Sequence, residues 1–316
     1  RTYSGTDDFI RLAEMYADTI NIAWCAIPLF WFNQMDGRGP WDLEGSIREH
    51  QSVMKWYGEH NIPVELNEPH HWGMRDSSDA VFVVSAFLAA YNARAFGVRD
   101  YIAQMMFNSP PGLSDAMDLA KMLTVMDLIS PLSQNGRGAR GEGDFHIWKQ
   151  TRIGLLSHPL DPEAARGHLA ASTYLQMALK PDIYHIVGHT EADHAATADD
   201  VIVASRIARR AIENAMGAPD LTADPRIAQR RAELASEVDA ILDAIRLLAP
   251  PEAGDPFTDA FTLARAVTSG ILDAPQLANN KFGRGQVRTR IVDGACVSVD
   301  EKGNPISEKE RLETLP

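Results

Sequence analysis

The sequence contains 316 residues, of which 45% are hydrophobic, so it is long enough to bury a large core in one α/β domain or in one domain with a small addition. Its formal net charge of −13 argues against nucleic acid as a partner, because binding of a phosphate backbone requires a basic stripe that the sequence lacks.

Cysteine usage and hydropathy indicate the cellular compartment. Cys25 and Cys296 lie far apart and fit no metal or disulfide spacing, which is typical of a protein in the reducing cytoplasm. The richest apolar run, residues 20–32, is shorter than a membrane-spanning helix and contains Asn21 and Pro28. We therefore expect a cytoplasmic protein that does not associate with a membrane.

Helical periodicity, cap residues and short apolar runs predict alternating helices and strands along the first two thirds of the chain. After a helix near residues 9–16, the predicted strands lie at about 20–27, 62–66, 100–107, 145–149 and 183–187. The helices that follow these strands lie at about 42–60, 78–97, 114–129, 160–179 and 197–217. A helix after every strand is typical of a parallel sheet.

This alternation leaves two architectures open, an incomplete eightfold barrel and an open doubly wound sheet. The spacing of the strands and the polar clusters after nearly every strand favour an α/β fold of the TIM-type (β/α)8 barrel class, of which this chain supplies about five βα units. Beyond residue 217 the pattern changes to helices at about 225–248 and 257–272 and a small β segment at 287–299. We therefore expect barrel units in residues 1–217 and a C-terminal appendage of helices and a small β segment in residues 218–316.

The turn after the fifth predicted strand is the first candidate site. It contains His189, Glu191 and His194 and precedes a helix that begins with the capping-box pair Thr197 and Asp200. Ligands of parallel α/β folds bind where strands end and helices begin, so these side chains are candidate ligand contacts. A zinc site that includes His185 is an alternative, but spacings of four and five residues fit no common zinc pattern.

Other candidate residues follow the remaining strands. Glu68 is a candidate base, because burial at a strand end raises the pKa of a carboxyl group, although Pro69 also fits a purely structural turn. Arg38 is a candidate partner for a substrate carboxylate, although a loop arginine is also commonly just solvated. The other candidates at strand ends and in the loop after the first strand are Asn33, Asp36, Asn67, Asn108 and Lys149.

Several phrases of the sequence resemble one known family. The phrases GTDDFIRLAE, ELNEP and IYHIVGHTEADHAATADDV are similar to the C-terminal two thirds of the large subunit of glutamate mutase, also called methylaspartate mutase. The resemblance implies an adenosylcobalamin-dependent isomerase whose large subunit is a TIM barrel. It also implies a small partner subunit, because the cobalamin-binding Asp-x-His-x-x-Gly motif of that subunit does not occur here. The first three barrel strands are expected before Arg1, in another polypeptide or in a longer form of this chain.

The resemblance also assigns roles to individual residues. It implies cofactor contacts from His189, Glu191 and His194 and places Tyr3 at a substrate position. Their positions at strand ends and in the loop after the first strand make Asn67 and Asn108 further candidate cofactor contacts, Glu68 the candidate catalytic residue, and Asn33, Asp36, Arg38 and Lys149 candidate substrate contacts. Tyr3 stands where the family has an arginine for a substrate carboxylate, and the region of Trp24 lacks the glutamate that acts on the substrate amine. An aromatic pocket of Trp24, Phe30, Trp31 and Phe32 is expected instead, which favours a substrate other than glutamate.

The implied reaction is a radical rearrangement of a carbon skeleton that begins with homolysis of the cobalt–carbon bond. The protein then excludes water and positions the reacting carbons, and no protein nucleophile is required. Two alternatives remain open at this point. One is a metal-dependent barrel hydrolase or lyase that uses the histidine and carboxylate loops, and the other is a non-catalytic scaffold for a cobalamin-binding partner.

Overall fold

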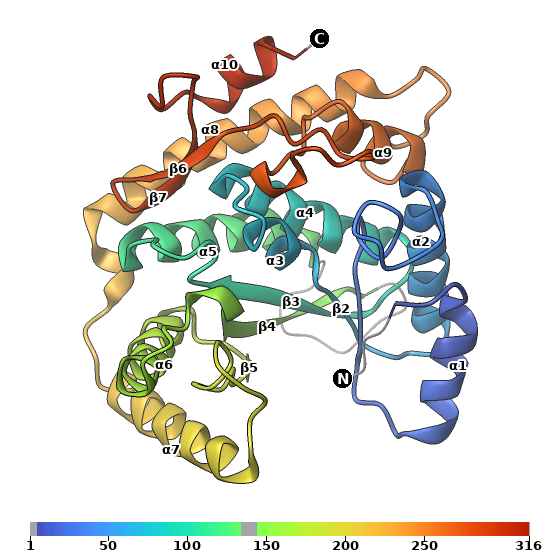
Figure 1. Cartoon of the computed structure of the whole chain (residues 1–316). Helices are drawn as coiled ribbons and strands as arrows, with labels where there is room; N and C mark the ends of the chain where they lie inside the picture. Colours follow the sequence, from blue (N-terminus) through green and yellow to red (C-terminus); the bar gives the residue numbers. More distant parts are fainter. Residues whose placement is uncertain (1–4, 134–143, 316) are drawn as a thin grey trace.

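The computed structural model describes residues 5–133 and 144–315 and contains a parallel five-stranded sheet with the order β1-β2-β3-β4-β5 (Figure 1). The strands are β1 (Cys25–Ile27), β2 (Val64–Leu66), β3 (Asp100–Phe107), β4 (His146–Ile153) and β5 (Ile183–Tyr184). Each pairs in parallel with the next strand along the chain. The predicted α/β fold with strands and helices in alternation is therefore confirmed.

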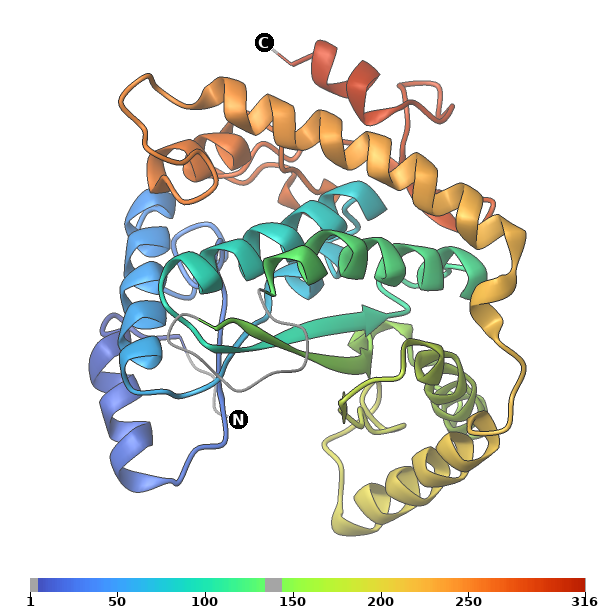
Figure 2. The same ribbon diagram turned by 180° about the vertical axis from the view of Figure 1, so that it is seen from behind.

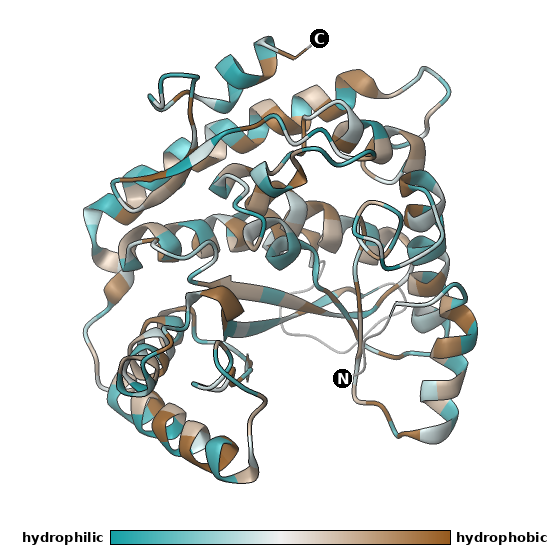
Figure 3. Ribbon diagram, viewed as in Figure 1, coloured by the Kyte–Doolittle hydropathy of each residue, from teal (hydrophilic) through white to brown (hydrophobic). Residues whose placement is uncertain are grey.

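Helices connect the strands and begin at the side-chain caps that the sequence contains. The helices of the first two thirds are α1 (Phe9–Thr19), α2 (Leu43–Glu59), α3 (Glu68–Gly73), α4 (Asp79–Ala95), α5 (Asp115–Ile129), α6 (Pro162–Gln176) and α7 (Ala198–Ala215). The predicted capping box of Thr197 and Asp200 is present at the start of α7, with both reciprocal hydrogen bonds formed. Alternating hydrophilic and hydrophobic residues along the ribbons of α7 and α8 (Pro225–Leu248) are visible in Figure 3.

Some predicted boundaries are wrong. The first strand is predicted over residues 20–27, but residues 20–24 connect α1 to β1, and Ile20 is an exposed C-cap of α1. The fifth strand is shorter than predicted, whereas β4 continues four residues beyond Lys149. The polar segment after β2, predicted as a turn, forms the short helix α3, with Pro69 in its first turn where no backbone N–H is needed.

One face of the sheet packs against the helices. Side chains alternate along β3, and Tyr101, Ala103, Met105 and Phe107 belong to the main hydrophobic core, which Met106 near the end of the strand also joins. Helices α4 and α5 lie on this side of the sheet, and α8 lies beyond them in both views (Figures 1 and 2). None of the helices drawn in colour crosses the opposite face of β2, β3 and β4 in these views.

The C-terminal segment packs on the outside of these helices. Helix α8 (Pro225–Leu248) contacts α4 and α5, α9 (Ala260–Thr268) contacts α2, and α10 (Glu308–Glu313) contacts α8. An antiparallel hairpin of β6 (Thr289–Val292) and β7 (Ala295–Ser298) follows α9 in the chain, and β7 contacts α4. The main hydrophobic core contains residues from both sides of residue 217. The division into barrel units and a C-terminal appendage at that residue stays a prediction.

Buried charges join α4, α5 and α8. The Lys121 ammonium, which is completely buried, lies 3.4 Å from Asp79 Oδ1 and 3.1 Å from Asp118 Oδ1, and it donates to the Ser109 carbonyl at 2.7 Å. Arg230 of α8 lies 3.5 Å from Asp79 Oδ2. A buried cluster of this kind becomes strongly destabilising when one member is lost, because the remaining charges stay uncompensated. No helix within the two described ranges is long and apolar enough to cross a membrane.

Candidate functional site

A polar cluster lies on the sheet face that points away from the helices. Val64 and Leu66 belong to the core, so Glu65 between them points to the opposite face. Glu65 pairs in register with Ile102, and two residues further along β3 lies Gln104, which pairs with Gln150 of β4. Strand alternation therefore brings Glu65, Gln104 and Gln150 together, and all three side chains are buried.

The Glu65 carboxylate is the centre of this cluster. Its Oε1 accepts a hydrogen bond from Gln104 Nε2 at 2.7 Å. Its Oε2 accepts from Gln150 Nε2 at 2.9 Å and from the Trp24 indole Nε1 at 2.9 Å. One carboxylate thus joins β2, β3, β4 and the residue before β1, and we call this group, Trp24, Glu65, Gln104 and Gln150, the Glu65 cluster.

The cluster extends to the carboxyl end of β2 through Gln104. The carbonyl oxygen of Gln104 is hydrogen-bonded to His70 Nδ1, and its Nε2 also lies 3.4 Å from Asn67 Oδ1. Because an amide oxygen only accepts, His70 Nδ1 carries the proton in this contact. Asn67, a predicted cofactor contact, is completely buried beside the cluster.

Glu68, the predicted catalytic base, faces the loop after β1. Its Oε2 accepts from the backbone N–H groups of Leu29 at 2.6 Å and Phe30 at 3.1 Å, and its Oε1 accepts from the Trp72 indole at 2.8 Å. Burial raises the pKa of Glu68 to about 7, although these N–H donors oppose the rise. The carboxylate therefore fixes the position of the loop relative to α3.

The loop after β1 is itself tightly organised. Asn33 is completely buried, donates to the Phe30 carbonyl and to Ser46 Oγ at 2.9 Å each, and accepts from Met35 N–H at 2.8 Å. Asp36 accepts from the backbone N–H groups of Phe32 and Asn33, each at 3.1 Å. Both side chains thus hold the loop in shape.

Arg38 and the aromatic residues of the same loop differ in exposure. Arg38 is exposed, with its guanidinium 5.0 Å from the centre of the Phe32 ring. Phe30, Trp31 and Phe32 are fully buried in the main core, where Trp31 packs against Trp72 and under the Arg75 guanidinium. Of the predicted aromatic pocket, only Trp24 takes part in the Glu65 cluster, while the other three pack with the helices.

The remaining predicted substrate and cofactor residues of β3 and β4 form internal contacts. Asn108 adopts a left-handed backbone with φ 57°, its N–H donates to Asp118 Oδ2 at 2.5 Å, and its Oδ1 accepts from Ser172 at 2.6 Å. Lys149 Nζ donates to the Leu179 carbonyl at 2.8 Å. In β4, Lys149 alternates with Gln150, so the two side chains point to opposite faces of the sheet. Tyr3 lies outside the described residues.

The turn after β5 contains one buried and two exposed candidates. His189 is buried, its Nε2 lies 3.9 Å from Asp200 Oδ1, and its Nδ1 has no hydrogen-bond partner among the described residues. Glu191 and His194 are exposed. The hydrogen bond from His194 Nδ1 to Asp193 at 2.8 Å, together with Asp200, raises the pKa of His194.

A second histidine pair lies near this turn and was not predicted. His158 follows β4, is buried, and makes an edge contact with the ring of His168 on α6 at 5.3 Å between ring centres. Burial lowers the pKa of His158 to about 4, with His168 and His189 acting in the same direction. His158 is therefore neutral at physiological pH. Among residues 5–133 and 144–315, no group of three or more histidine, cysteine or acidic side chains is arranged to hold a metal ion.

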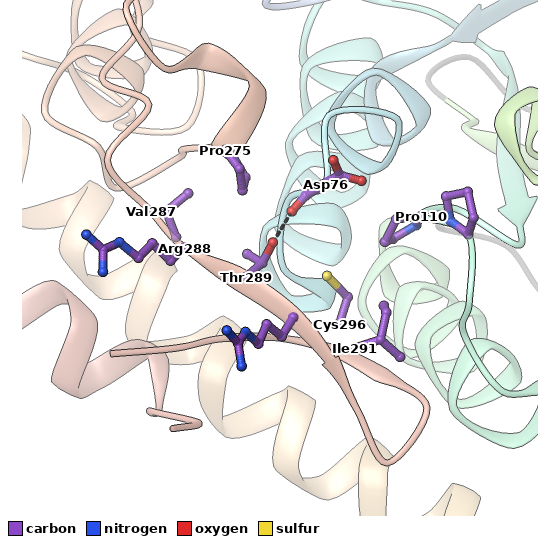
Figure 4. Close-up of a pocket in the computed structure, with 10 residues that line it drawn as sticks. Asp76, Pro110, Pro275, Val287, Arg288, Thr289, Ile291 and Cys296 are labelled. Carbon is purple, nitrogen blue, oxygen red and sulfur yellow. Dashed lines mark hydrogen bonds between the residues drawn. The ribbon is translucent and has the colours of Figure 1, made fainter. Parts of the chain in front are cut away.

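A cavity of about 350 Å³ lies beside the C-terminal hairpin (Figure 4). Thr289 Oγ1 donates to the Asp76 carbonyl at 2.6 Å, and the Cys296 thiol donates to the Ser77 carbonyl at 3.3 Å. Burial raises the pKa of Cys296 to about 12, so the thiol is protonated and is not a nucleophile. The Arg288 side chain points away from Asp76 in Figure 4. The walls of this cavity thus fix the hairpin to the segment after α3.

Sequence reasoning missed the Glu65 cluster and found only its neighbours. Glu65 and Gln104 interrupt apolar stretches, Val64-Glu65-Leu66 and Ala103-Gln104-Met105, whereas Gln150 lies between Lys149 and Thr151 in a largely polar strand and Trp24 lies before β1. For Glu65 and Gln104, a single polar residue in a buried strand is the available signal, because burial of a polar group requires a hydrogen-bond partner; no such signal marks Gln150 or Trp24. No protein-family model matches the chain, and no curated protein matches it either.

Proposed function

We propose that the chain supplies five consecutive βα units of a (β/α)8 barrel. The strand order follows the chain order without a reversal, whereas a doubly wound sheet reverses direction at its switch point. Right-handed crossovers between neighbouring parallel strands all place their helices on the same face, which is the arrangement of a barrel wall. The Glu65 cluster then lies on the inner side of that wall.

Completion of the barrel requires three further strands. In the described sheet β1 pairs only with β2, and β5 pairs only with β4, so both outer strands present a free edge for a parallel neighbour. Ile186, Val201 and Ile202 are exposed apolar side chains in the last βα unit, next to one of these edges. A further chain or segment with three βα units is the partner that these edges fit.

The proposed activity is that of the large-subunit component of an adenosylcobalamin-dependent carbon-skeleton mutase. The observation that carries this proposal is the buried Glu65 carboxylate, which accepts hydrogen bonds from two amides and an indole on the inner side of the sheet. A fixed polar group that is shielded from water suits the binding of a small substrate. The resemblance to glutamate mutase supplies the reaction class. Bound adenosylcobalamin, which a small partner subunit carries, supplies the radical that starts the rearrangement.

The candidate cofactor residues at the strand ends differ in whether their side chains are available to a bound corrin. Glu191 and His194 are exposed at the carboxyl end of β5 and are available to the amide groups of a corrin. His189 adds a buried ring nitrogen without a partner in the described part of the chain, which suits a hydrogen bond to a bound molecule. Asn67 and Asn108 lie at the same ends of β2 and β3, and their internal contacts fit them to shape the site.

The substrate contacts divide in a similar way. The Glu65 cluster orients the substrate on the inner face, and Glu68 acts as a positioning residue because it holds the loop after β1. Arg38 on that loop is the candidate for a substrate carboxylate, while Asn33 and Asp36 maintain the loop conformation. Lys149 lies on the other face of β4, and its ammonium group donates a hydrogen bond to the Leu179 carbonyl.

Affinity purification of the full-length protein from its native source tests the proposal. We expect a small protein with the Asp-x-His-x-x-Gly motif to co-purify, as identified by mass spectrometry, together with the absorbance of a corrinoid. Recovery of the protein without a corrinoid and without such a partner, at native expression level, contradicts the proposal.

A further inference from the structure

Gln104 and Gln150 occupy equivalent positions on neighbouring strands. Their Cα atoms are register partners, both side chains are buried, and both donate through Nε2 to the Glu65 carboxylate at 2.7 and 2.9 Å. In both contacts the NH₂ group of the amide faces Glu65. The carbonyl oxygens of both glutamines therefore point away from Glu65.

The side-chain carbonyl oxygens of Gln104 and Gln150 differ in their hydrogen-bond partners. Gln104 Oε1 is hydrogen-bonded to His70 Nδ1, so both ends of this amide are used. Gln150 Oε1 is buried and has no hydrogen-bond partner within the described ranges. Rotation of the Gln150 amide does not remove the problem, because it brings Oε1 against the oxygen atoms of Glu65.

Buried carbonyl groups are almost always hydrogen-bonded, and an unpaired one lowers the stability of a protein. From this geometry we infer that Gln150 Oε1 is a substrate-specificity group that accepts a hydrogen bond from an N–H or O–H donor of the bound small molecule. The inference rests on the proposed function in one respect, namely that the substrate binds on the Glu65 side of the sheet.

The inference limits the substrate class to small molecules that carry an amino or hydroxyl group on the side that contacts Gln150 of β4. A neutral carbonyl discriminates between such a molecule and its counterpart without the donor, because the counterpart leaves the carbonyl unpaired. An unpaired buried polar group weakens binding by about tenfold to a hundredfold.

Two matched variants test the premise without any ligand. Gln104→Met and Gln150→Met each remove one N–H donor from Glu65, but only Gln104→Met also removes a carbonyl that is already paired. We expect the equilibrium constant of unfolding, measured in urea with the full-length protein, to rise about tenfold more in Gln104→Met than in Gln150→Met. Equal destabilisation, or failure of Gln150→Met alone to fold, overturns the premise that Oε1 is unpaired.

A panel of compounds then tests the binding role. Its members are the twenty amino acids, the matching 2-hydroxy acids and the matching acids without a 2-substituent, and the readout is the shift in melting temperature of the full-length protein. We expect at least one amino or hydroxy acid to stabilise the wild-type protein and the control Glu59→Gln, whose substitution lies at an exposed position outside the Glu65 cluster, and to lose about tenfold or more in affinity for Gln150→Met.

Three results overturn the inference. These are no stabilisation of the wild-type protein by any donor-bearing compound, equal binding to Gln150→Met, or equal binding of the acid without a 2-substituent. None of the measurements involves a corrinoid, so a negative result in the purification experiment and a negative result here are separate outcomes.

Discussion

At the scale of single residues, Glu65 holds four elements together through one side chain. Replacement by glutamine puts an NH₂ group where a carboxylate oxygen accepts hydrogen bonds, so at least one N–H donor of Trp24, Gln104 or Gln150 loses its acceptor. We expect Glu65→Gln to lower the free energy of unfolding by about 1–3 kcal/mol, measured by urea denaturation. Glu59→Gln, at an exposed position, is the control, and an equal effect of the two substitutions contradicts this role.

Glu68 makes the stability of the protein depend on pH in a defined direction. Its pKa is raised from 4.5 to about 7 in the folded protein, mainly by burial, so the folded state binds the proton more tightly than the unfolded chain. The stabilisation is complete below about pH 4.5 and is lost as the pH rises through about 7, by roughly 3 kcal/mol in total.

Urea denaturation of the wild-type protein and of Glu68→Gln at several pH values between 4.5 and 7.5 measures this contribution. The decline in stability with rising pH is expected to be steeper in the wild-type protein, because the amide does not titrate. Parallel curves for the two proteins refute the raised pKa.

The sequence identified residues near the site better than the site itself. Asn67 and Glu68 follow a strand that ends in polar residues, so position along the chain was enough to select them. Glu65, Gln104 and Gln150 come together only because the three strands pair in one register, and the register depends on contacts between distant segments. Side-chain roles such as the loop contacts of Asn33 also depend on the folded structure.

At the scale of elements, the presence of a helix or strand is easier to predict from the sequence than its length. Long helices with caps, such as α4 after Ser78 and α7 after Thr197, carry strong local signals, and both begin where the sequence predicts. Strand length depends on the neighbour, and β5 comprises two residues because only Ile183 and Tyr184 pair with β4. The short helix α3 has no apolar periodicity, since all its residues are buried.

Helix α7 is expected to be a local unfolding unit. It packs with α6 on a small hydrophobic cluster of Ile153, Leu169, Val187 and Ala204 that is separate from the main core. Thr197→Ala removes the N-cap of α7 and should destabilise this helix by about 1 kcal/mol.

Hydrogen exchange followed by mass spectrometry measures this effect. Amides of α7 should exchange several-fold faster in Thr197→Ala, while amides of α4 in the main core keep their wild-type rates. Ser114→Ala, which removes the cap of α5, is the matched control and should leave α7 unchanged. Uniform acceleration throughout the protein contradicts the separate behaviour of α7.

At the scale of the whole molecule, one core and one buried charge cluster extend across the predicted boundary at residue 217. Lys121→Met leaves Asp118 buried without a cation and Asp79 with Arg230 alone, so we expect a loss of about 3–5 kcal/mol in the free energy of unfolding. Lys55→Met, which removes an exposed ion pair with Glu59 at 4.0 Å, should cost less than about 1 kcal/mol.

Hydrogen exchange of the Lys121→Met variant tests whether the C-terminal helices belong to the same cooperative unit as α5. Because Arg230 of α8 and Lys121 of α5 share Asp79, protection of α5 and α8 against hydrogen exchange should fall together in Lys121→Met. Loss of protection in α5 alone contradicts a single cooperative core and supports an independent C-terminal domain.

The central claim is that a small molecule undergoes a radical rearrangement against the Glu65 side of the sheet. Hydrogen transfer measures this most directly. The full-length protein is combined with its small cobalamin-binding partner and adenosylcobalamin tritiated at the 5′ carbon, and then exposed to a small-molecule extract of the native source. We predict that tritium enters one extracted compound, that this compound bears an amino or hydroxyl group, and that Glu65→Gln abolishes the transfer whereas Glu59→Gln does not. Absence of tritium from every small molecule, in a complex that retains its corrinoid, would contradict the account.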